Sequence, residues 1–284
     1  MRVLIPLLLF AALGAAEDRG VVLEVVLPKA EFEIGEPILG ELRFTNRGEE
    51  TWEIDEPHVI RFYEVFEARD RDGDLVPNPF GDIVHHTYSG PVERHALAPG
   101  ATVTIRRFVN ANAAFSMSGA YTVRARYRVA KPRPEVDAFV AESPPVSITL
   151  KAPDPDRRRK EIAELKRLLD DPRLAETELK AWKPLLRNAG TRTGALRLLA
   201  FHREQSLMPL FLDLTEKGEP LAAEALAGLP DREAVFKALK ARVENPAEHD
   251  TRTLRDLYAS LAVPKTDALT WEEVFERRRA LLGK

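Results

Sequence analysis

The spacing of apolar side chains changes once along this chain, near residues 151–160. Upstream, apolar and polar residues alternate, as in Ser118–Val129, whereas downstream apolar residues recur every three or four positions, as in Ile162–Leu169. Alternation is typical of a strand with one buried face, and the longer spacing is typical of an amphipathic helix. Pro153 and Pro155 flank a polar segment at the change, as expected for an interdomain linker. The sequence therefore predicts an all-strand half followed by an all-helix half.

The first half contains about seven or eight strand candidates, which are separated by turn residues rather than by helical repeats. The clearest candidates are Val21–Pro28, Pro37–Asn46, His58–Asp70, Thr102–Val109, Ala120–Val129 and Val146–Leu150. Short strands at this spacing favour an antiparallel β-sandwich.

Residues Leu97–Tyr127 carry a Pro-Gly turn before one strand, with Gly119 and Tyr121 at the start of the next. This segment resembles the late strands of an immunoglobulin-like domain. The resemblance implies that Tyr121 forms a tyrosine corner, in which its hydroxyl binds backbone a few residues upstream. Phe32–Glu50 is similar to bacterial extracellular sandwich modules, including those of small proteinase-inhibitor domains. The resemblance covers roughly residues 20–151 and implies an immunoglobulin-like antiparallel β-sandwich.

The second half carries a weak internal repeat, in which a shift of about 28 residues superimposes apolar positions. The superimposed pairs are Ala195 with Ala223, Leu198 with Leu226, Phe201 with Leu229, Leu207 with Val235, Met208 with Phe236, and Phe211 with Leu239. They resemble short HEAT-like repeats, whose helix pairs stack because one pair alone cannot bury its apolar face. A plain helical bundle is the alternative. We expect a β-sandwich over 17–152 and an all-α HEAT-like repeat or bundle domain over 153–284.

Helix ends are also marked in the second half. Asp231 precedes an apolar periodic segment, and Thr270 with Glu273 can form a capping box. Gly190 and Gly218 stand where helices are expected to stop.

The first 16 residues have the pattern of a secretory signal peptide. Arg2 precedes an apolar run over Val3–Leu13, and small residues follow up to Ala16, where cleavage is expected. A buried N-terminal strand or helix is the alternative. The run is too short for a bilayer span of about 20 residues. We therefore expect a periplasmic or secreted protein, with no membrane span in the mature chain.

The chain has no cysteine, which excludes disulfides, a thiol nucleophile and thiolate metal sites. Its formal net charge of −3 provides no general attraction to nucleic acid. The usual nucleophile, dinucleotide, phosphate-loop and zinc-helix patterns do not occur. We expect no catalytic residue, no cofactor and no nucleic-acid partner, and hence a protein that is not an enzyme.

Two short segments have residue types that bind metals. Asp70, Asp72 and Asp74 have the spacing of the first ligands in a calcium loop, but the glycine and glutamate that such a loop needs are missing, so we favour a hairpin turn. His85 and His86 are adjacent imidazoles that could bind a transition metal from a bent loop. A polar loop at one end of the sandwich is the favoured interpretation, so no metal ligand is assigned.

Arg124, Arg126 and Arg128 lie on the polar side of one predicted strand. Residues 17–93 hold 19 acidic and 7 basic side chains, whereas residues 94–151 hold 3 acidic and 9 basic ones. Because opposite charges across strands stabilise a sheet by about 0.2–1 kcal/mol each, we expect a paired, solvated outer face. The acidic partners available are Glu64 and Glu67. The alternative is a docking patch for an anionic glycan or a partner protein.

These observations favour a non-enzymatic, exported binding or scaffold protein whose partner is a protein or a cell-envelope glycan. A protease inhibitor or chaperone-like factor that acts through the sandwich is the alternative. A hydrolase with a hidden pair of carboxylates is the less favoured third hypothesis.

Overall fold

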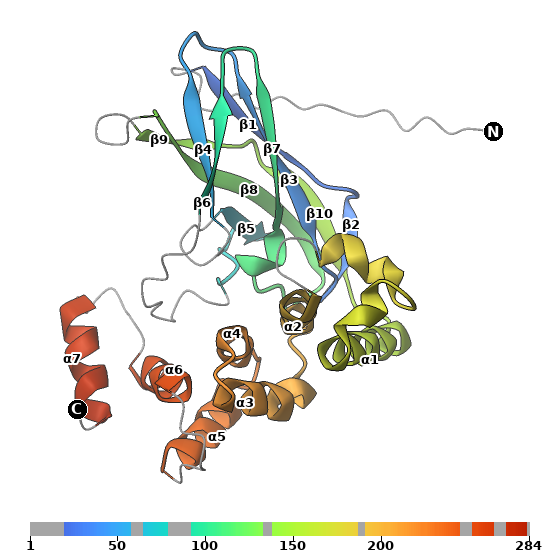
Figure 1. The fold of residues 1–284 in the computed structure, drawn as a ribbon, viewed down its shortest axis with the longest axis vertical. Coiled ribbons are helices and arrows are strands. Elements are labelled where there is room, and N and C mark those ends of the chain that lie inside the picture. Colours follow the sequence, from blue (N-terminus) through green and yellow to red (C-terminus); the bar gives the residue numbers. More distant parts are fainter. Residues whose placement is uncertain are drawn as a thin grey trace.

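A computed structural model describes residues 20–57, 65–78, 92–132, 138–186, 191–244, 252–263 and 271–282. Within these ranges, a β-rich N-terminal region precedes a helical C-terminal region, as the change in apolar spacing predicts (Figure 1). The last strand ends at Lys151 and the first helix begins at Pro155.

The β-rich region has two sheets that share one hydrophobic core. The strands are β1 Val21–Val26, β2 Glu31–Glu33, β3 Leu39–Asn46, β4 Trp52–Pro57, β5 Phe66–Asp70, β6 Val92–Leu97, β7 Thr102–Phe108, β8 Gly119–Ala130, β9 Ala138–Glu142 and β10 Val146–Lys151. One sheet has the order β1-β3-β7, and the other has the order β2-β10-β8-β4-β6, with β5 and β9 also paired to β8. All pairs are antiparallel except β2 with β10.

Strand β8 is the centre of the larger sheet. Its first half pairs with β5 and β10, and its second half pairs with β4 and β9. Tyr121, Val123, Ala125, Tyr127 and Val129 point inward and are buried, as their alternation predicts. Each large apolar side chain buried in this way contributes about 1.5–3 kcal/mol.

Four strands, β2, β4, β6 and β9, lie outside the candidates that the sequence suggests. They are short, and charged residues interrupt β4 (WEIDEP) and β6 (VERHAL). Trp52 and Ile54, on the inner face of β4, are nevertheless buried. The candidate over His58–Asp70 is a strand only at β5, and its residues 58–64 lie outside the described ranges.

Seven α-helices follow. They are α1 Pro155–Asp170, α2 Thr191–His202, α3 Met208–Glu216, α4 Pro220–Ala227, α5 Arg232–Glu244, α6 Arg252–Ala262 and α7 Trp271–Leu281. Asp231 caps α5 by accepting a hydrogen bond from the Ala234 amide at 2.9 Å, and Gly218, with φ +81°, follows the end of α3, as the sequence predicts. Gly190 and Thr270 lie outside the described residues.

The internal repeat of the sequence relates two helix pairs. Its first copy covers α2 and α3, and its second covers α4 and α5. In five of the six superimposed apolar pairs both members are buried, and in the sixth, Met208 with Phe236, both are partly buried. The superimposed positions therefore have matching burial in the helical core.

The two regions pack directly against each other. Phe108 and Ala111, at the end of β7, belong to the helical core, and the Phe108 ring meets Phe201 of α2 edge-on at 5.3 Å between centroids. Arg157 of α1 forms an ion pair with Glu33 of β2 at 3.0 Å. We call this contact the β–α interface. The segment around Pro153 and Pro155, which the sequence predicts to be a linker, therefore joins two regions that contact each other.

His202, at the end of α2, is buried at this interface. Its Cα lies 3.2 Å from where a Cβ on Gly35 would stand, and neither ring nitrogen has a hydrogen-bond partner among the described residues. Arg158 of α1 donates a hydrogen bond to the His202 carbonyl oxygen and pairs with Glu204. Burial, with a smaller contribution from the charge of Arg158, lowers the pKa of His202 to about 4.

We expect His202 to make the protein less stable in acid. Because the folded pKa lies below the unfolded value of 6.5, the unfolded chain binds a proton first, and stability falls as the pH drops from 6.5 towards 4. The loss approaches about 3 kcal/mol. Denaturant unfolding of the full chain and of His202→Leu at several pH values measures it, with a flatter profile expected for the variant. Equal slopes would contradict this assignment.

Candidate functional site

Three arginines line the outer side of β8. Arg124 lies opposite Glu67 of β5, with its guanidinium 3.0 Å from the carboxylate. Arg126 lies opposite Glu142 of β9, and its Nε is 2.8 Å from the carboxylate. The exposed Arg128 side chain forms no ion pair or hydrogen bond within the described part of the chain. The structure thus pairs two of the three arginines and leaves the third open.

Around β8, guanidinium groups outnumber the carboxylates that pair with them. Arg69 also binds Glu67, at 2.9 Å, so Arg69, Arg124 and Arg126 share the carboxylates of Glu67 and Glu142, and Arg128 adds a fourth guanidinium group. We call these six residues the arginine face. The hydrogen bond from Arg124, assisted by Arg69 and opposed by partial burial, lowers the pKa of Glu67.

Glu67 is one of the two partners that the sequence suggests, and Glu64 lies outside the described residues. Glu142 is a partner that the sequence did not indicate, because it belongs to an unpredicted strand.

A groove of about 340 Å³ opens beside the arginine face. Arg126 and Arg128 line it together with Asn78, Leu75 and Val140. The side chains of Leu75 and Val140 are apolar and about half exposed, at 57% and 49%. Basic and apolar groups therefore meet within one concave surface, an arrangement that sequence spacing alone could not reveal.

Tyr121 and Gly119 position the start of β8. The Tyr121 hydroxyl donates a hydrogen bond to the Met117 carbonyl oxygen at 2.8 Å, four residues upstream, which is the contact that the immunoglobulin-like resemblance implies. Burial, followed by the charge of Asp70, raises the pKa of Tyr121, so the hydroxyl keeps its proton. Gly119 has φ +152°, a backbone conformation that residues other than glycine rarely adopt. Tyr121 and Gly119 therefore stabilise the start of β8.

Asp70, Asp72 and Asp74 form a tight turn rather than a ring of ligands. The Asp70 carboxylate accepts hydrogen bonds from the amides of Asp72 and Asp74, at 3.0 and 2.9 Å. Gly73 has φ +87° at the tip, and Arg69 bridges to Leu75 across the turn. This is the hairpin favoured from the sequence.

His85 and His86 lie outside the described residues. Another group of potential metal ligands, Glu56, Glu93 and His95, has side-chain atoms within 4.8 Å of one another on β4 and β6. In the sequence, Glu93 and His95 stand two residues apart, so in one strand their side chains point to the same face.

Glu56 in this group already has cationic and hydrogen-bonding partners. His95 lies 2.8 Å from Glu56, and Arg107 donates a hydrogen bond to the same carboxylate at 2.7 Å. Burial would raise the pKa of Glu56, but Arg107, with His95, outweighs it and lowers the pKa. With Arg107 of β7, the group thus forms a charge network that joins the two sheets, and we assign no metal to it.

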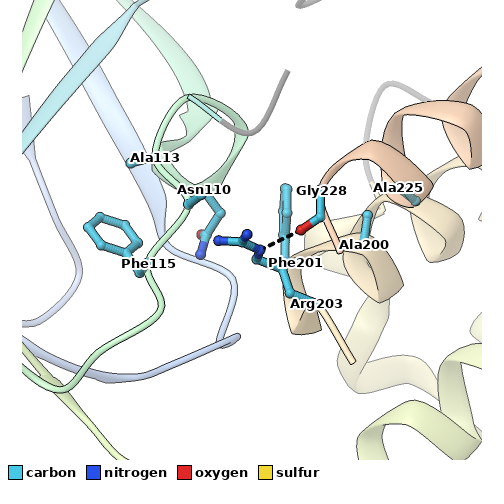
Figure 2. Close-up of a pocket in the computed structure, with 9 residues that line it drawn as sticks. Asn110, Ala113, Phe115, Ala200, Phe201, Arg203, Ala225 and Gly228 are labelled. Carbon is cyan, nitrogen blue, oxygen red and sulfur yellow. Dashed lines mark hydrogen bonds between the residues drawn. The ribbon is translucent and has the colours of Figure 1, made fainter. Parts of the chain in front are cut away.

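A second, smaller cavity lies at the β–α interface (Figure 2). Asn110 and Phe115 line it from the β-rich region, and Phe201, Arg203 and Gly228 line it from the helices. Its volume, about 20 Å³, suffices for about one water-sized particle. It was not accessible to sequence reasoning, because the two regions that form it are distant in the chain.

No family model matches this chain, and no curated protein matches it significantly. Solved structures match over about half of it. Northeast Structural Genomics Consortium target SoR45 is 14% identical, with a TM-score of 0.27 over 48% of this chain and 90% of its own. The sporulation control protein Spo0M from Bacillus subtilis is 12% identical, with a TM-score of 0.27 over 53% of this chain and 56% of its own.

A PapD-like domain of human CEP192 is 11% identical, with a TM-score of 0.24 over 52% of this chain and 99% of its own. At TM-scores this low, the similarities carry no argument about activity or partner. Within the described residues, every helix is too short or too polar to cross a bilayer.

We expect Glu67→Gln to weaken the fold at neutral pH but not in acid. The lowered pKa of Glu67 means that its ionised form stabilises the folded state above the unfolded pKa, and that this contribution disappears as the pH falls through the folded pKa. Because Arg124 is 37% exposed, the effect at pH 7 is at most about 1 kcal/mol.

Denaturant unfolding at pH 7 and at pH values below the carboxyl range measures this difference. Exposed Glu49, which forms no ion pair within the described residues, provides the control Glu49→Gln. An equal loss at both pH values would show that Glu67 acts through packing rather than charge.

Proposed function

We propose that this protein is a non-enzymatic, exported binding protein, and that its arginine face and the adjoining groove hold an acidic segment of a partner protein. The observation that carries this proposal is that Arg128, which has no ion pair within the described residues, lines one groove with exposed apolar side chains. Export rests on the signal-peptide pattern of residues 1–16.

The chemistry of the groove favours a peptide with both carboxylate and apolar side chains. Within the part of the chain that the structure describes, Arg128 has no side-chain partner, and guanidinium groups bind carboxylates through two parallel hydrogen bonds. Leu75 and Val140 offer apolar surface on the same groove. An extended segment that alternates acidic and apolar side chains satisfies both features.

The finer description of the fold belongs to the same proposal. An immunoglobulin-like sandwich is supported by two sheets over one core and by the hydrogen bond from Tyr121 to Met117. HEAT-like repeats over α2–α5 are supported by the matching burial of the repeated positions. In this description the helices form a scaffold that is fixed to the sandwich through the β–α interface.

Fluorescence anisotropy with a labelled peptide of alternating glutamate and leucine residues tests the binding proposal at low salt. We expect the full chain to bind it, and Arg128→Gln to weaken binding about 3- to 10-fold, which corresponds to about 0.7–1.4 kcal/mol, the usual net contribution of one hydrogen bond. Arg126→Gln should weaken it less, because Arg126 already has a carboxylate partner.

Arg173→Gln is the matched control, since Arg173 is an exposed arginine of the helical region that pairs with Asp171. A lack of binding by the full chain, or equal weakening by the control, contradicts the proposal. A heparin oligosaccharide forms a separate arm. If it displaces the peptide and binds more tightly, the occupant is a sulfated glycan and not an acidic peptide.

A further inference from the structure

His202 is a buried titratable residue of the β–α interface. It is 2% exposed, and both of its ring nitrogens are buried without a hydrogen-bond partner among the described residues. The ring packs against the turn at Gly35, where a Cβ would lie 3.3 Å from Nδ1. Because each ring nitrogen of a neutral imidazole can form a hydrogen bond, the closed interface leaves both of them unsatisfied even before a proton is added.

The charge that acts on His202 from α1 is also positive, that of Arg158. Arg158 donates a hydrogen bond to the His202 carbonyl oxygen and pairs with Glu204, so the Glu204 carboxylate already has a cationic partner. Within the described residues no carboxylate forms an ion pair with His202. A proton on His202 would therefore place a second positive charge beside Arg158 in a buried position.

The carboxylates of the turn after β2 also have partners of their own. Glu33 pairs with Arg157 of α1 at 3.0 Å, and Glu36 pairs with Lys29. Glu161 of α1 contacts the same Arg157, at 3.3 Å. Burial, followed by the neighbouring carboxylates, outweighs Arg157 and raises the pKa of Glu161, so protonation of Glu161 in acid favours the closed interface.

Each region has a hydrophobic core of its own. Among the described residues, the core of the sandwich contains no helical side chain, and the β-rich region contributes only Phe108 and Ala111 to the buried part of the helical core. Figure 1 shows that the helices meet the sandwich at one end, next to α1 and α2. Because so few apolar side chains cross the interface, the two regions can separate without dismantling either core.

We propose that the β–α interface is a pH-sensitive switch, which opens in acid while both regions stay folded, because the protonated imidazole of His202 must reach water. In the closed interface the imidazolium has no protein acceptor, whereas water hydrates it as soon as the interface opens. Histidine suits this role, since its charge in water changes between about pH 5 and 8. The switch is independent of the arginine face and of the ligand proposed for it.

The direction of the response follows from the two states of His202. Burial, followed by the charge of Arg158, lowers its pKa from 6.5 to about 4 in the closed interface. The open state therefore binds the proton first, and opening becomes more favourable as the pH falls from 6.5 to about 4. Because each pH unit in this window changes the equilibrium up to about tenfold, opening should increase about 30-fold between pH 8 and pH 5.

Single introduced cysteines test the proposal, because the chain has none of its own. Ala111→Cys places a thiol in the closed interface, where a pyridyl disulfide reaches it only after opening, and exposed Thr104→Cys corrects for the pH dependence of the reaction itself. Relative to Thr104→Cys, labelling of Ala111→Cys should accelerate about 30-fold from pH 8 to pH 5. Adding His202→Leu should abolish the acceleration, and His202→Gln replaces it if the leucine variant does not fold.

Two further buried cysteines distinguish opening from unfolding. Ala125→Cys reports the core of the sandwich and Ala259→Cys reports α6, so neither should accelerate with Ala111→Cys. Glu161→Gln should keep the acceleration at Ala111→Cys, since Glu161 acts in the opposite direction. Equal acceleration at all three buried cysteines would show that acid unfolds the whole chain, and acceleration that survives the loss of His202 would assign it to another group. Either result overturns the proposal, as does labelling of Ala111→Cys that does not change with pH.

Discussion

The pairing of β8 with four other strands is the constraint on which the β-rich region depends. Twelve residues of nearly unbroken alternation provide one buried face and one charged face. The buried face fixes the register, because a shift of one residue would place arginines in the core. The same register places Arg124 opposite Glu67 and Arg126 opposite Glu142, so core packing also determines the charge pattern outside.

The β–α interface makes the two regions one structure. Phe108, at the end of β7, packs in the helical core, and Arg157 of α1 forms an ion pair with Glu33 of β2. The imidazole of His202 at this interface is buried with no hydrogen-bond partner among the described residues. Such a group is unusual in protein interiors, and it identifies where the interface responds to solution conditions.

The structural features that depend on local residue spacing could be predicted from the sequence. The inward face of β8, the cap at Asp231, the turn at Gly73 and the burial of the apolar positions in α2–α5 all follow from residues near one another in the chain. Glu142 was missed because the five residues of β9 carry no clear pattern. The cavity at Arg203 could not be predicted, because a left-handed backbone and a wall from a distant region have no local signal.

The position of β10 has a mechanical consequence. This strand lies between β8 and β2 and leads almost directly into α1, whose capping residue Asp154 donates its amide to Glu33 of β2. A force that pulls the helices away from the sandwich would run along β10. Its hydrogen bonds to both neighbours would then be strained together in shear instead of opening one after another. The helical region is thus attached to the sandwich through a strand that resists tension.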